Sequence, residues 1–247
     1  MQTILGSGEF GKVFLSSSVH NPDLQVAIKA MDKIKLKVDV ELIAHEVAAI
    51  SKLDHPNIIN FYETYNDYRY VYLVMEYCPG KPLSRHFSEG KVNSEKEVRK
   101  VMFQVVSAIS HCHAMGIIHR DIKPDNIMIT NKDKQVKLID FGLARNGLND
   151  EDQQICGTPY YMAPEMITRA GYSAKIDVWS MGVMLYFLVT GQMPFTGHTQ
   201  KELFAKICFG KVDYEIDALG FVSKQCVDLM KKMLVHNPKK RITALQV

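Results

Sequence analysis

The sequence contains few cysteines, and their placement is unlike that in disulfide-rich or zinc-binding domains. There are five in 247 residues, an odd number, widely spaced and without any Cys-x-x-Cys pair. Disulfide frameworks use even numbers of cysteines and structural zinc sites use closely spaced pairs, so neither is expected. Unpaired thiols persist in reducing compartments, and we therefore expect a cytoplasmic protein.

The sequence also lacks a strong charge of either sign and any long apolar run. Its 30 Lys and Arg against 27 Asp and Glu leave a formal net charge of +3. This bias is too weak to predict nucleic acid as a partner. The longest apolar stretch, Met181 to Val189, is far shorter than a bilayer span, so no membrane segment is predicted. The first residues contain neither a basic nor an apolar signal-peptide region.

The first third of the chain is dominated by short apolar runs interrupted by Gly, Asn and Pro, which favours an antiparallel sheet. The stretch from Asp39 to Leu53 has apolar residues at helical spacing and predicts one main helix. The segment from Cys78 to Pro82, which contains two prolines and a glycine, is the best linker candidate.

Beyond this linker the pattern changes to helical. Apolar periodicity predicts helices over 95–114 and 176–190, with short strands and loops between them. We therefore predict an α+β fold with two lobes that form one domain. The small antiparallel-sheet lobe spans 1–77, and the larger, mainly helical lobe spans 78–247. A ligand would bind between the two lobes.

Two motifs in the second lobe indicate phosphoryl chemistry. Residues 119–126 have the sequence His-Arg-Asp-Ile-Lys-Pro-Asp-Asn, and Asp-Phe-Gly follows at 140–142. Hard cations such as Mg²⁺ prefer oxygen ligands, which Asn126 and Asp140 supply. Asp121 could accept the proton of an attacking alcohol.

Near the start of the chain, glycines occur in a Gly-x-Gly-x-x-Gly-x-Val pattern. Missing side chains let backbone N–H groups approach phosphates closely. Alone the pattern is weak, because a dinucleotide-binding turn or a flexible hairpin can have it too. A β-rich stretch rather than a helix follows it, and no suitably placed ribose-binding acid appears, which argues against the dinucleotide-binding turn. The predicted nucleotide-binding residues in this segment are Gly6, Ser7, Gly8, Glu9, Phe10 and Gly11.

These motifs belong to an ordered series that covers nearly the whole chain. Its members are the glycine-rich segment, Lys29 in Val-Ala-Ile-Lys, Glu46 in the predicted helix, His-Arg-Asp, Asp-Phe-Gly and Ala-Pro-Glu at 163–165. In this order and spacing they resemble the catalytic domain of eukaryotic protein kinases.

The type of kinase is indicated by two further features. Lys123 and the segment 157–165, Gly-Thr-Pro-Tyr-Tyr-Met-Ala-Pro-Glu, resemble the Ser/Thr type. Together with the stretch 227–242, this segment looks closest to the calcium/calmodulin-dependent and calcium-dependent protein kinases.

The resemblance implies ATP and Mg²⁺ as cofactors and protein hydroxyls as acceptors, with Mg²⁺ on the two oxygen-bearing side chains named above. It implies that Asp121 is the catalytic acid-base and that Lys123 clamps the transferring phosphate. It also implies that Lys29 and Glu46 form the pair that orients the nucleotide.

Further matched positions lie around the expected adenine ring or between the lobes, where ordinary core packing is a compatible role. The adenine-site positions are Val13, Ala27 and Met128 for the faces of the ring, Glu76 and Cys78 for backbone hydrogen bonds, and Met75 as gatekeeper. The structural positions are Ile50, Phe61, His119 and Phe141 as a stack between the lobes, Glu165 with Arg241 as a buried pair, and Asp177 as a brace for the catalytic loop.

Two features depart from the family pattern. Pro82 replaces a glutamate that relatives preferring basic substrates often carry, and Asp125 remains as an acidic contact for substrate or as a solvated residue. From 143 to 157 there is no Ser, Thr or Tyr, although Arg120 in such kinases commonly pairs with a phosphorylated residue there. The acidic stretch 149–152 either substitutes for the phosphate or simply faces solvent.

The resulting interpretation is a Mg²⁺-dependent protein serine/threonine kinase acting on protein substrates. One alternative is a pseudokinase, a nucleotide-binding scaffold without turnover. Another is a small-molecule kinase of the same fold, which the segment 157–165 disfavours because it resembles a peptide-docking loop. The presence of every residue assigned to the chemistry favours the enzyme. The resemblance also allows a regulatory domain or calcium sensor outside this chain as a partner.

Overall fold

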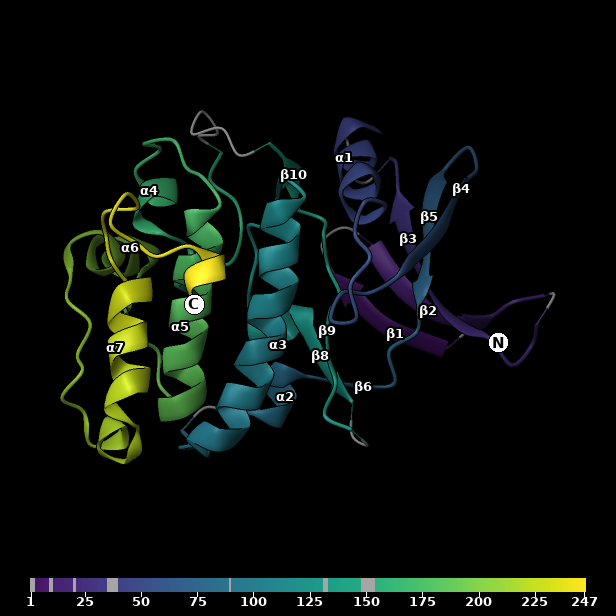
Figure 1. Ribbon diagram of the computed structural model, residues 1–247. Helices are drawn as coiled ribbons and strands as arrows, with labels where there is room; N and C mark the ends of the chain where they lie inside the picture. Colours follow the sequence, from purple (N-terminus) through teal and green to yellow (C-terminus); the bar gives the residue numbers. More distant parts are fainter. Residues whose placement is uncertain are drawn as a thin grey trace.

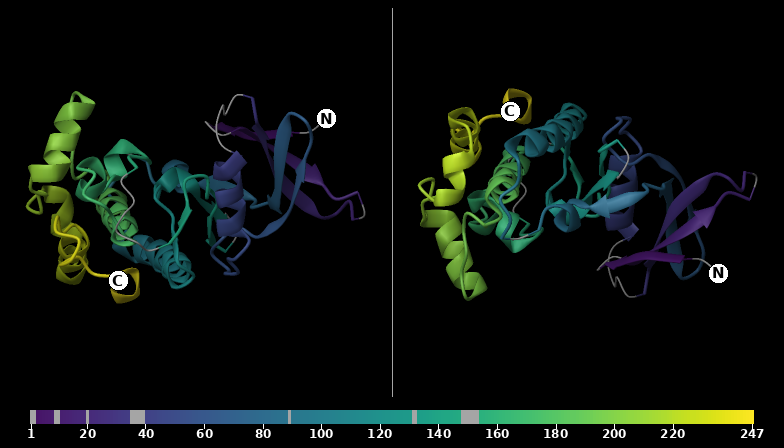
Figure 2. Two further views of the ribbon diagram at one scale, coloured as in Figure 1. Left: turned by 90° about the horizontal axis from the view of Figure 1, so that it is seen from above. Right: turned by 90° about the horizontal axis from the view of Figure 1, so that it is seen from below.

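The computed structural model of the protein describes residues 3–8, 11–19, 21–34, 40–88, 90–130, 133–147 and 154–247. The chain forms two lobes, one rich in strands and one mainly helical (Figure 1). Views from above and below show the purple and blue strands at one end and the green and yellow helices at the other (Figure 2). The expected α+β class is confirmed.

The N-terminal lobe is an antiparallel sheet with a helix packed against it. Its elements are β1 (Thr3–Gly8), β2 (Gly11–Ser17), β3 (Gln25–Asp32), α1 (Val40–Ile50), β4 (Phe61–Asn66) and β5 (Tyr70–Glu76). Within the described residues the strand order is β1-β2-β3-β5-β4. Ile43 and Ile50 of α1 share one hydrophobic cluster with Met31 of β3 and Leu73 of β5, so apolar burial holds the helix on the sheet.

In its described residues the C-terminal lobe combines helices with two small sheets. The helices are α2 (Leu83–His86), α3 (Glu95–Ala114), α4 (Pro164–Ile167), α5 (Lys175–Thr190), α6 (Gln200–Phe209) and α7 (Lys224–Met233), with 3₁₀ turns η1 (Pro124–Asn126), η2 (Pro159–Tyr161), η3 (Asp217–Phe221) and η4 (Ala244–Gln246). The strands are β6 (Gly80–Pro82), β7 (Ile117–Ile118), β8 (Ile127–Thr130), β9 (Val136–Leu138) and β10 (Arg145–Asn146). One sheet has the order β6-β8-β9, and β7 pairs with β10.

The expected linker is therefore partly a strand. Residues 80–82 form β6 and pair with β8, and an added Cβ on Gly80 would lie 2.3 Å from the carbonyl oxygen of Ile129. Only glycine permits this approach between the two backbones.

Helix α5 is the centre of the C-terminal lobe. From Ile176 to Thr190 nearly every residue is buried, Phe187 being the partly buried exception. A helix that is apolar on all sides must be surrounded by protein. It ends at Gly191, which adopts a left-handed φ of 71° and donates its amide to the carbonyl of Phe187, as is common for helix C-termini. No helix in the described ranges is long and apolar enough to span a bilayer.

The two lobes share a continuous core. One hydrophobic cluster contains Ile50 and Leu73 from the first lobe together with Phe141 and Met184 from the second. Backbone hydrogen bonds also join the lobes, because residues 57–59 of the first lobe run parallel to β9 of the second. The amide of Ile59 donates to Leu138 O at 2.9 Å, and the amide of Leu138 donates to Asn57 O at 2.9 Å. This junction holds β9, and the Asp140 that follows it, against the first lobe.

Candidate active site

Three charged side chains from distant parts of the chain meet where the lobes join. Lys29 Nζ lies 2.7 Å from Glu46 Oε1 and 3.1 Å from Asp140 Oδ1. Strand β3 carries Lys29, α1 carries Glu46, and Asp140 follows β9. The structure thus brings together the lysine and glutamate that were expected to pair and adds the Asp140 carboxylate to them.

Burial and charge act against each other on these groups. Burial alone would lower the pKa of Lys29, but the carboxylates of Glu46 and Asp140 outweigh it and hold that pKa above its ordinary value. Burial raises the pKa of Glu46, which the Lys29 ammonium opposes. Burial would also raise the pKa of Asp140, but Lys29 and the Gly142 amide reverse the effect, so its pKa lies below the ordinary value. At neutral pH Lys29 is a cation and Asp140 an anion.

The catalytic loop, residues 119–126, and Thr158 together hold the Asp121 carboxylate. One oxygen, Oδ1, accepts from the amide of Thr158 at 3.0 Å and from its hydroxyl at 2.8 Å. The other, Oδ2, accepts from Asn126 Nδ2 at 2.9 Å and lies 2.8 Å from Lys123 Nζ. Lys123 also donates to Thr158 Oγ1 at 2.7 Å. The carboxylate is thus fixed in orientation by four donors, two of which come from Thr158.

The two expected metal ligands are neighbours. The amide of Ile139 donates to the carbonyl oxygen of Asn126 at 3.0 Å, which places Asn126 beside the residue that precedes Asp140. The side-chain nitrogen of Asn126 is engaged by Asp121 O and Oδ2. Its Oδ1 is therefore the atom that could ligate a metal.

Asp177 on α5 binds the backbone of the catalytic loop. Its side chain is completely buried and accepts three hydrogen bonds, from the amides of His119 and Arg120, each at 2.9 Å, and from His113 Nε2 at 2.8 Å. Burial would raise the pKa of Asp177, but these donors outweigh it and lower the pKa. Arg120 has a left-handed φ of 69°, a strained conformation for a non-glycine residue. Asp177 thus holds a strained backbone in place.

The glycine-rich hairpin joins β1 to β2. Gly8 pairs with Gly11, which has a φ of 149° and lies so close to β3 that an added Cβ would be 2.1 Å from Ala30 O. A Cβ added to Gly6, in contrast, would meet no atom within 4 Å. Ser7 is exposed. Glu9 and Phe10, which were also expected to bind nucleotide, lie outside the described residues.

Of the residues expected around adenine, Val13, Ala27 and Met75 lie on neighbouring strands of the first sheet. Val13 of β2 pairs with Lys29, and Ala27 of β3 pairs with Met75 of β5. Met128 lies on β8 and is partly buried. Their roles toward a base remain predictions.

Glu76 at the end of β5 is held through its backbone, and Cys78, two residues later, is buried. The amide of Glu76 donates to Asn60 O at 2.8 Å. Burial raises the pKa of the Cys78 thiol to about 11, so this side chain is a neutral group at physiological pH.

The expected stack between the lobes is partly visible. Ile50 and Phe141 belong to the continuous core, and Phe61 packs against it. The rings of His119 and Phe141 meet edge to face with centroids 5.0 Å apart. This contact joins the catalytic loop to the Asp-Phe-Gly segment.

Arg120 contacts the segment that begins at Leu143. Its guanidinium donates to Leu143 O at 2.6 Å, to the Tyr172 hydroxyl at 3.0 Å and to Gln154 Oε1 at 3.4 Å. Tyr172 in turn donates to Gln154 O at 3.0 Å. The acidic stretch 149–152 lies outside the described residues, so its expected relation to Arg120 stays a hypothesis.

Two further expectations concern the C-terminal lobe. Arg241 binds Glu165 through both terminal nitrogens, at 2.7 and 3.0 Å, and the side chains are 0% and 5% exposed. Such bidentate geometry is the strong form of a charged pair. Asp125 is exposed and accepts a hydrogen bond from Ser84 Oγ at 2.7 Å, so it has an intramolecular partner in addition to solvent.

The side chains present fit a nucleotide with a divalent cation. Asn126 and Asp140 offer neighbouring oxygen atoms, and the Asp140 side chain is 36% exposed and therefore reachable. Lys29 offers a fixed cation for phosphate oxygens. The open space at Gly6 allows close approach to the backbone of the hairpin.

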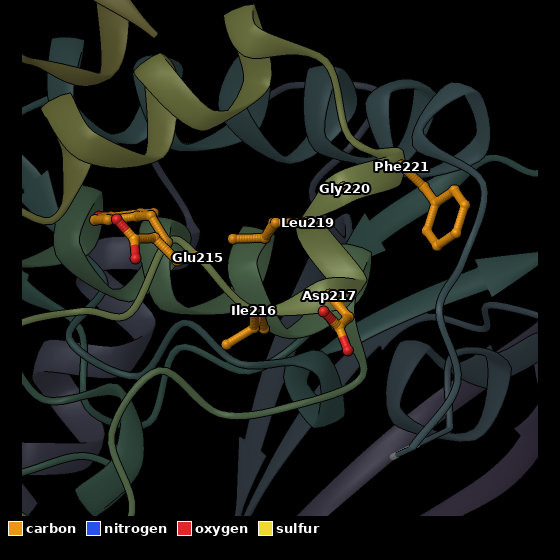
Figure 3. Close-up of a pocket in the computed structure, with 7 residues that line it drawn as sticks. Glu215, Ile216, Asp217, Leu219, Gly220 and Phe221 are labelled. Atoms are coloured by element: carbon orange, nitrogen blue, oxygen red, sulfur yellow. The ribbon is translucent and has the colours of Figure 1, made fainter.

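A separate hollow of about 560 Å³ lies on the C-terminal lobe (Figure 3). It is lined by Tyr214, Glu215, Ile216, Asp217, Leu219, Gly220 and Phe221. Among the residues that the structure describes, none of those predicted for catalysis or nucleotide binding lines it.

Some contacts at the site had no signal in the sequence. His113 on Asp177 and Tyr172 on Arg120 join residues 64 and 52 positions apart. Lys137 on Glu76 joins residues 61 positions apart. A lysine inside the apolar stretch 136–139 was the only available hint of the last contact, since a charged residue in a buried strand needs a partner.

The two-lobed fold and the charged cluster at its junction define a phosphotransferase of the protein kinase class. The chain matches the protein kinase domain over residues 1–247 and belongs to that family.

Similar proteins agree with this assignment. Calcium-dependent protein kinase 29 of Arabidopsis thaliana is 39% identical over 250 residues, which cover 98% of this chain and 46% of that protein. Probable serine/threonine-protein kinase MARK-A of Dictyostelium discoideum is 39% identical over 98% of this chain and 23% of its own length. Calcium/calmodulin-dependent protein kinase type 1 of Macrobrachium nipponense is 33% identical over 100% of this chain and 72% of its own length. The chain spans less than half the length of the first two relatives, and the predicted resemblance to these kinase groups is confirmed.

Proposed function

We propose that this chain transfers the γ-phosphate of ATP to serine or threonine hydroxyls of protein substrates. One connected series of contacts carries the proposal. Lys29 binds Asp140, the residue before Asp140 binds the backbone of Asn126, and the side chain of Asn126 binds Asp121. A phosphate-binding cation, two metal-binding oxygens and a proton acceptor are thereby held in one rigid unit, as phosphoryl transfer requires.

Each side chain of this unit has a role that follows from its partners. Asp121, held at Oδ2 by Asn126 and Lys123, orients the acceptor hydroxyl and takes its proton at Oδ1, from which the Thr158 hydroxyl must first withdraw. Lys123 holds negative charge on the transferring group. Lys29, kept in place by Glu46, binds phosphate oxygens of the nucleotide. These residues act by position and charge and form no covalent intermediate.

Asn126 and Asp140 would hold Mg²⁺ through their side-chain oxygens. When bound, the ion neutralises charge on the phosphates. The low pKa of Asp140 supports this assignment, because the ligand must be deprotonated.

The preference for Ser and Thr rests on Lys123. Lys123 and the segment that contains Thr158 resemble the Ser/Thr type in sequence, and the two side chains are in contact. The name of one similar protein, probable serine/threonine-protein kinase MARK-A, supports the same class.

Partners and localisation extend the proposal. Because the relatives named for calcium or calmodulin dependence are longer than this chain, we place any regulatory domain or calcium sensor outside these residues. The protein would act in the cytoplasm, which the five free thiols support.

A peptide array incubated with labelled ATP and Mg²⁺ tests the function. Wild-type chain should label peptides with Ser or Thr acceptors, and Asp121→Asn, which keeps the shape but loses the proton acceptor, should label none above background. Equal labelling by both proteins would refute the role of Asp121. Nucleotide binding without any labelling by the wild type would favour the pseudokinase alternative, which no observation at the site supports.

A further inference from the structure

Lys137 is a buried cation close to the site that the proposed mechanism does not use. It lies in the middle of β9, three residues before Asp140, and its side chain is 7% exposed. Its Nζ lies 2.8 Å from Glu76 Oε2 and 3.3 Å from the carbonyl oxygen of Ile58. A buried lysine is costly to desolvate, so its retention inside a strand calls for a reason.

The partner of Lys137 lies at the other end of the predicted nucleotide site. Glu76 is the last residue of β5, where the backbone is expected to bind adenine. The oxygen that binds Lys137 also accepts from the amide of Asn60 at 3.1 Å, and the amide of Glu76 donates to Asn60 O at 2.8 Å. Lys137 therefore connects three segments: β9, the end of β5, and the residues from Ile58 to Asn60.

We propose that Lys137 is a positioning residue that sets the distance between the adenine-binding and the metal-binding ends of the nucleotide site. The inference rests on the proposed function. One nucleotide must contact both the end of β5 and Asp140. Lys137 binds Glu76 at the end of β5 directly, and it lies on the short strand β9, three residues before Asp140. Met128, which is expected to contact the adenine ring, is the strand partner of Lys137. Lys137 therefore also adjoins the strand that carries this adenine contact.

Stability alone does not explain the pair. Replacing a buried ion pair by apolar side chains of similar size is often neutral for folding or even stabilising. An apolar pair at these two positions would therefore serve folding about as well. What it could not supply is the directional link to Glu76 Oε2 and Ile58 O, because only a donor of sufficient length reaches both.

Three variants separate positioning from stability. Lys137→Met keeps the length of the side chain and removes the donor, and Lys137→Arg keeps charge and donors. Lys175→Met is the matched control, because Lys175 also donates to a backbone carbonyl, that of Arg241, but lies on α5, which carries none of the residues predicted to bind nucleotide. Affinity for a fluorescent ATP analogue with Mg²⁺, measured at equilibrium, needs no turnover. KM for ATP and for a peptide substrate gives the kinetic counterpart.

We expect Lys137→Met to weaken binding of the analogue and to raise KM for ATP by about tenfold, within the usual range of coupling between sites, while KM for peptide stays unchanged. Lys137→Arg and Lys175→Met should bind the analogue within about twofold of the wild type. Wild-type affinity in Lys137→Met, or an equal loss in Lys175→Met, would overturn the positioning role.

Two further outcomes are decisive. If Lys137→Met does not fold, Glu76→Gln tests the same link, because it keeps an acceptor but removes the charge. Unchanged nucleotide affinity in that variant would then overturn the proposal. A wild-type protein that binds the analogue but transfers no phosphate would refute the proposed function, while the affinity ratios would still decide the role of Lys137.

Discussion

Asp177→Ala should destabilise the protein strongly, because one buried carboxylate satisfies two backbone groups of the catalytic loop. The amides of His119 and Arg120 both donate to it, and the loop there is buried. Each buried N–H left without an acceptor costs about 1 to 3 kcal/mol, so the variant should lose about 2 to 6 kcal/mol of the free energy of unfolding. The left-handed φ of Arg120 adds strain that the variant no longer restrains.

Urea denaturation of the wild type, Asp177→Ala and Asp177→Asn measures this loss. Asp228→Ala, which removes an exposed aspartate of α7, is the control and should change stability by less than about 0.5 kcal/mol. A loss below about 1 kcal/mol in Asp177→Ala would refute the bracing role.

The pH dependence gives a second readout. Because the pKa of Asp177 is lower in the folded protein than its ordinary value of 3.8, the unfolded chain binds the proton more readily. The carboxylate therefore contributes its full stabilisation above pH 3.8. This contribution is lost as the pH falls through the lower pKa of the folded protein. The stability difference between wild type and Asp177→Asn should shrink in that acid range. A difference that stays constant with pH would contradict the assigned ionisation.

Three other perturbations have defined outcomes. Glu165→Ala should cost about 3 to 5 kcal/mol in urea denaturation, because Arg241 would be left buried without its carboxylate; an unchanged midpoint would contradict this. Gly11→Ala should cost about 1 to 3 kcal/mol, since its φ is positive and its Cβ would collide with Ala30 O; wild-type thermal stability would show that β2 and β3 can separate. Lys29→Met should stay folded, because Glu46, whose pKa burial raises, can take up a proton when its partner is lost. The variant should transfer no phosphate, since the cation that binds the nucleotide is gone; wild-type turnover would exclude a role for Lys29.

Much of the fold could be predicted from hydrophobic patterns. Helix α3 begins and ends where the periodicity placed it, and α5 begins one residue earlier than expected. Both helices have long, unambiguous apolar patterns. The main helix of the first lobe was also found, although α1 ends at Ile50 and the residues up to Leu53 form a turn.

Other elements escaped because their residues face solvent. Strand β4 is at the edge of its sheet, and all its residues after Phe61 are exposed. No alternation of apolar and polar residues marks such a strand. Helices α6 and α7 have ten residues each and bury two side chains each, so neither apolar pattern is long enough to mark a helix.

At the site, motifs could place residues in roles but could not supply their partners. The pair of Lys29 and Glu46 was expected, since motif spacing carries it. Thr158 had been noted only as a mark of kinase type, yet it donates twice to Asp121. Ser84 on Asp125 likewise joins residues 41 positions apart. Contacts of this kind depend on how the lobes and loops pack, which local patterns do not encode.

The most direct test is a single-turnover experiment with the purified chain in excess over γ-labelled ATP, Mg²⁺ and a protein substrate. We predict that label appears in phosphoserine or phosphothreonine, and that Asp121→Asn slows its appearance by at least about 100-fold while nucleotide affinity is retained. Bound nucleotide with no label in any protein hydroxyl, under every divalent cation supplied, would contradict the assignment of this site to phosphoryl transfer.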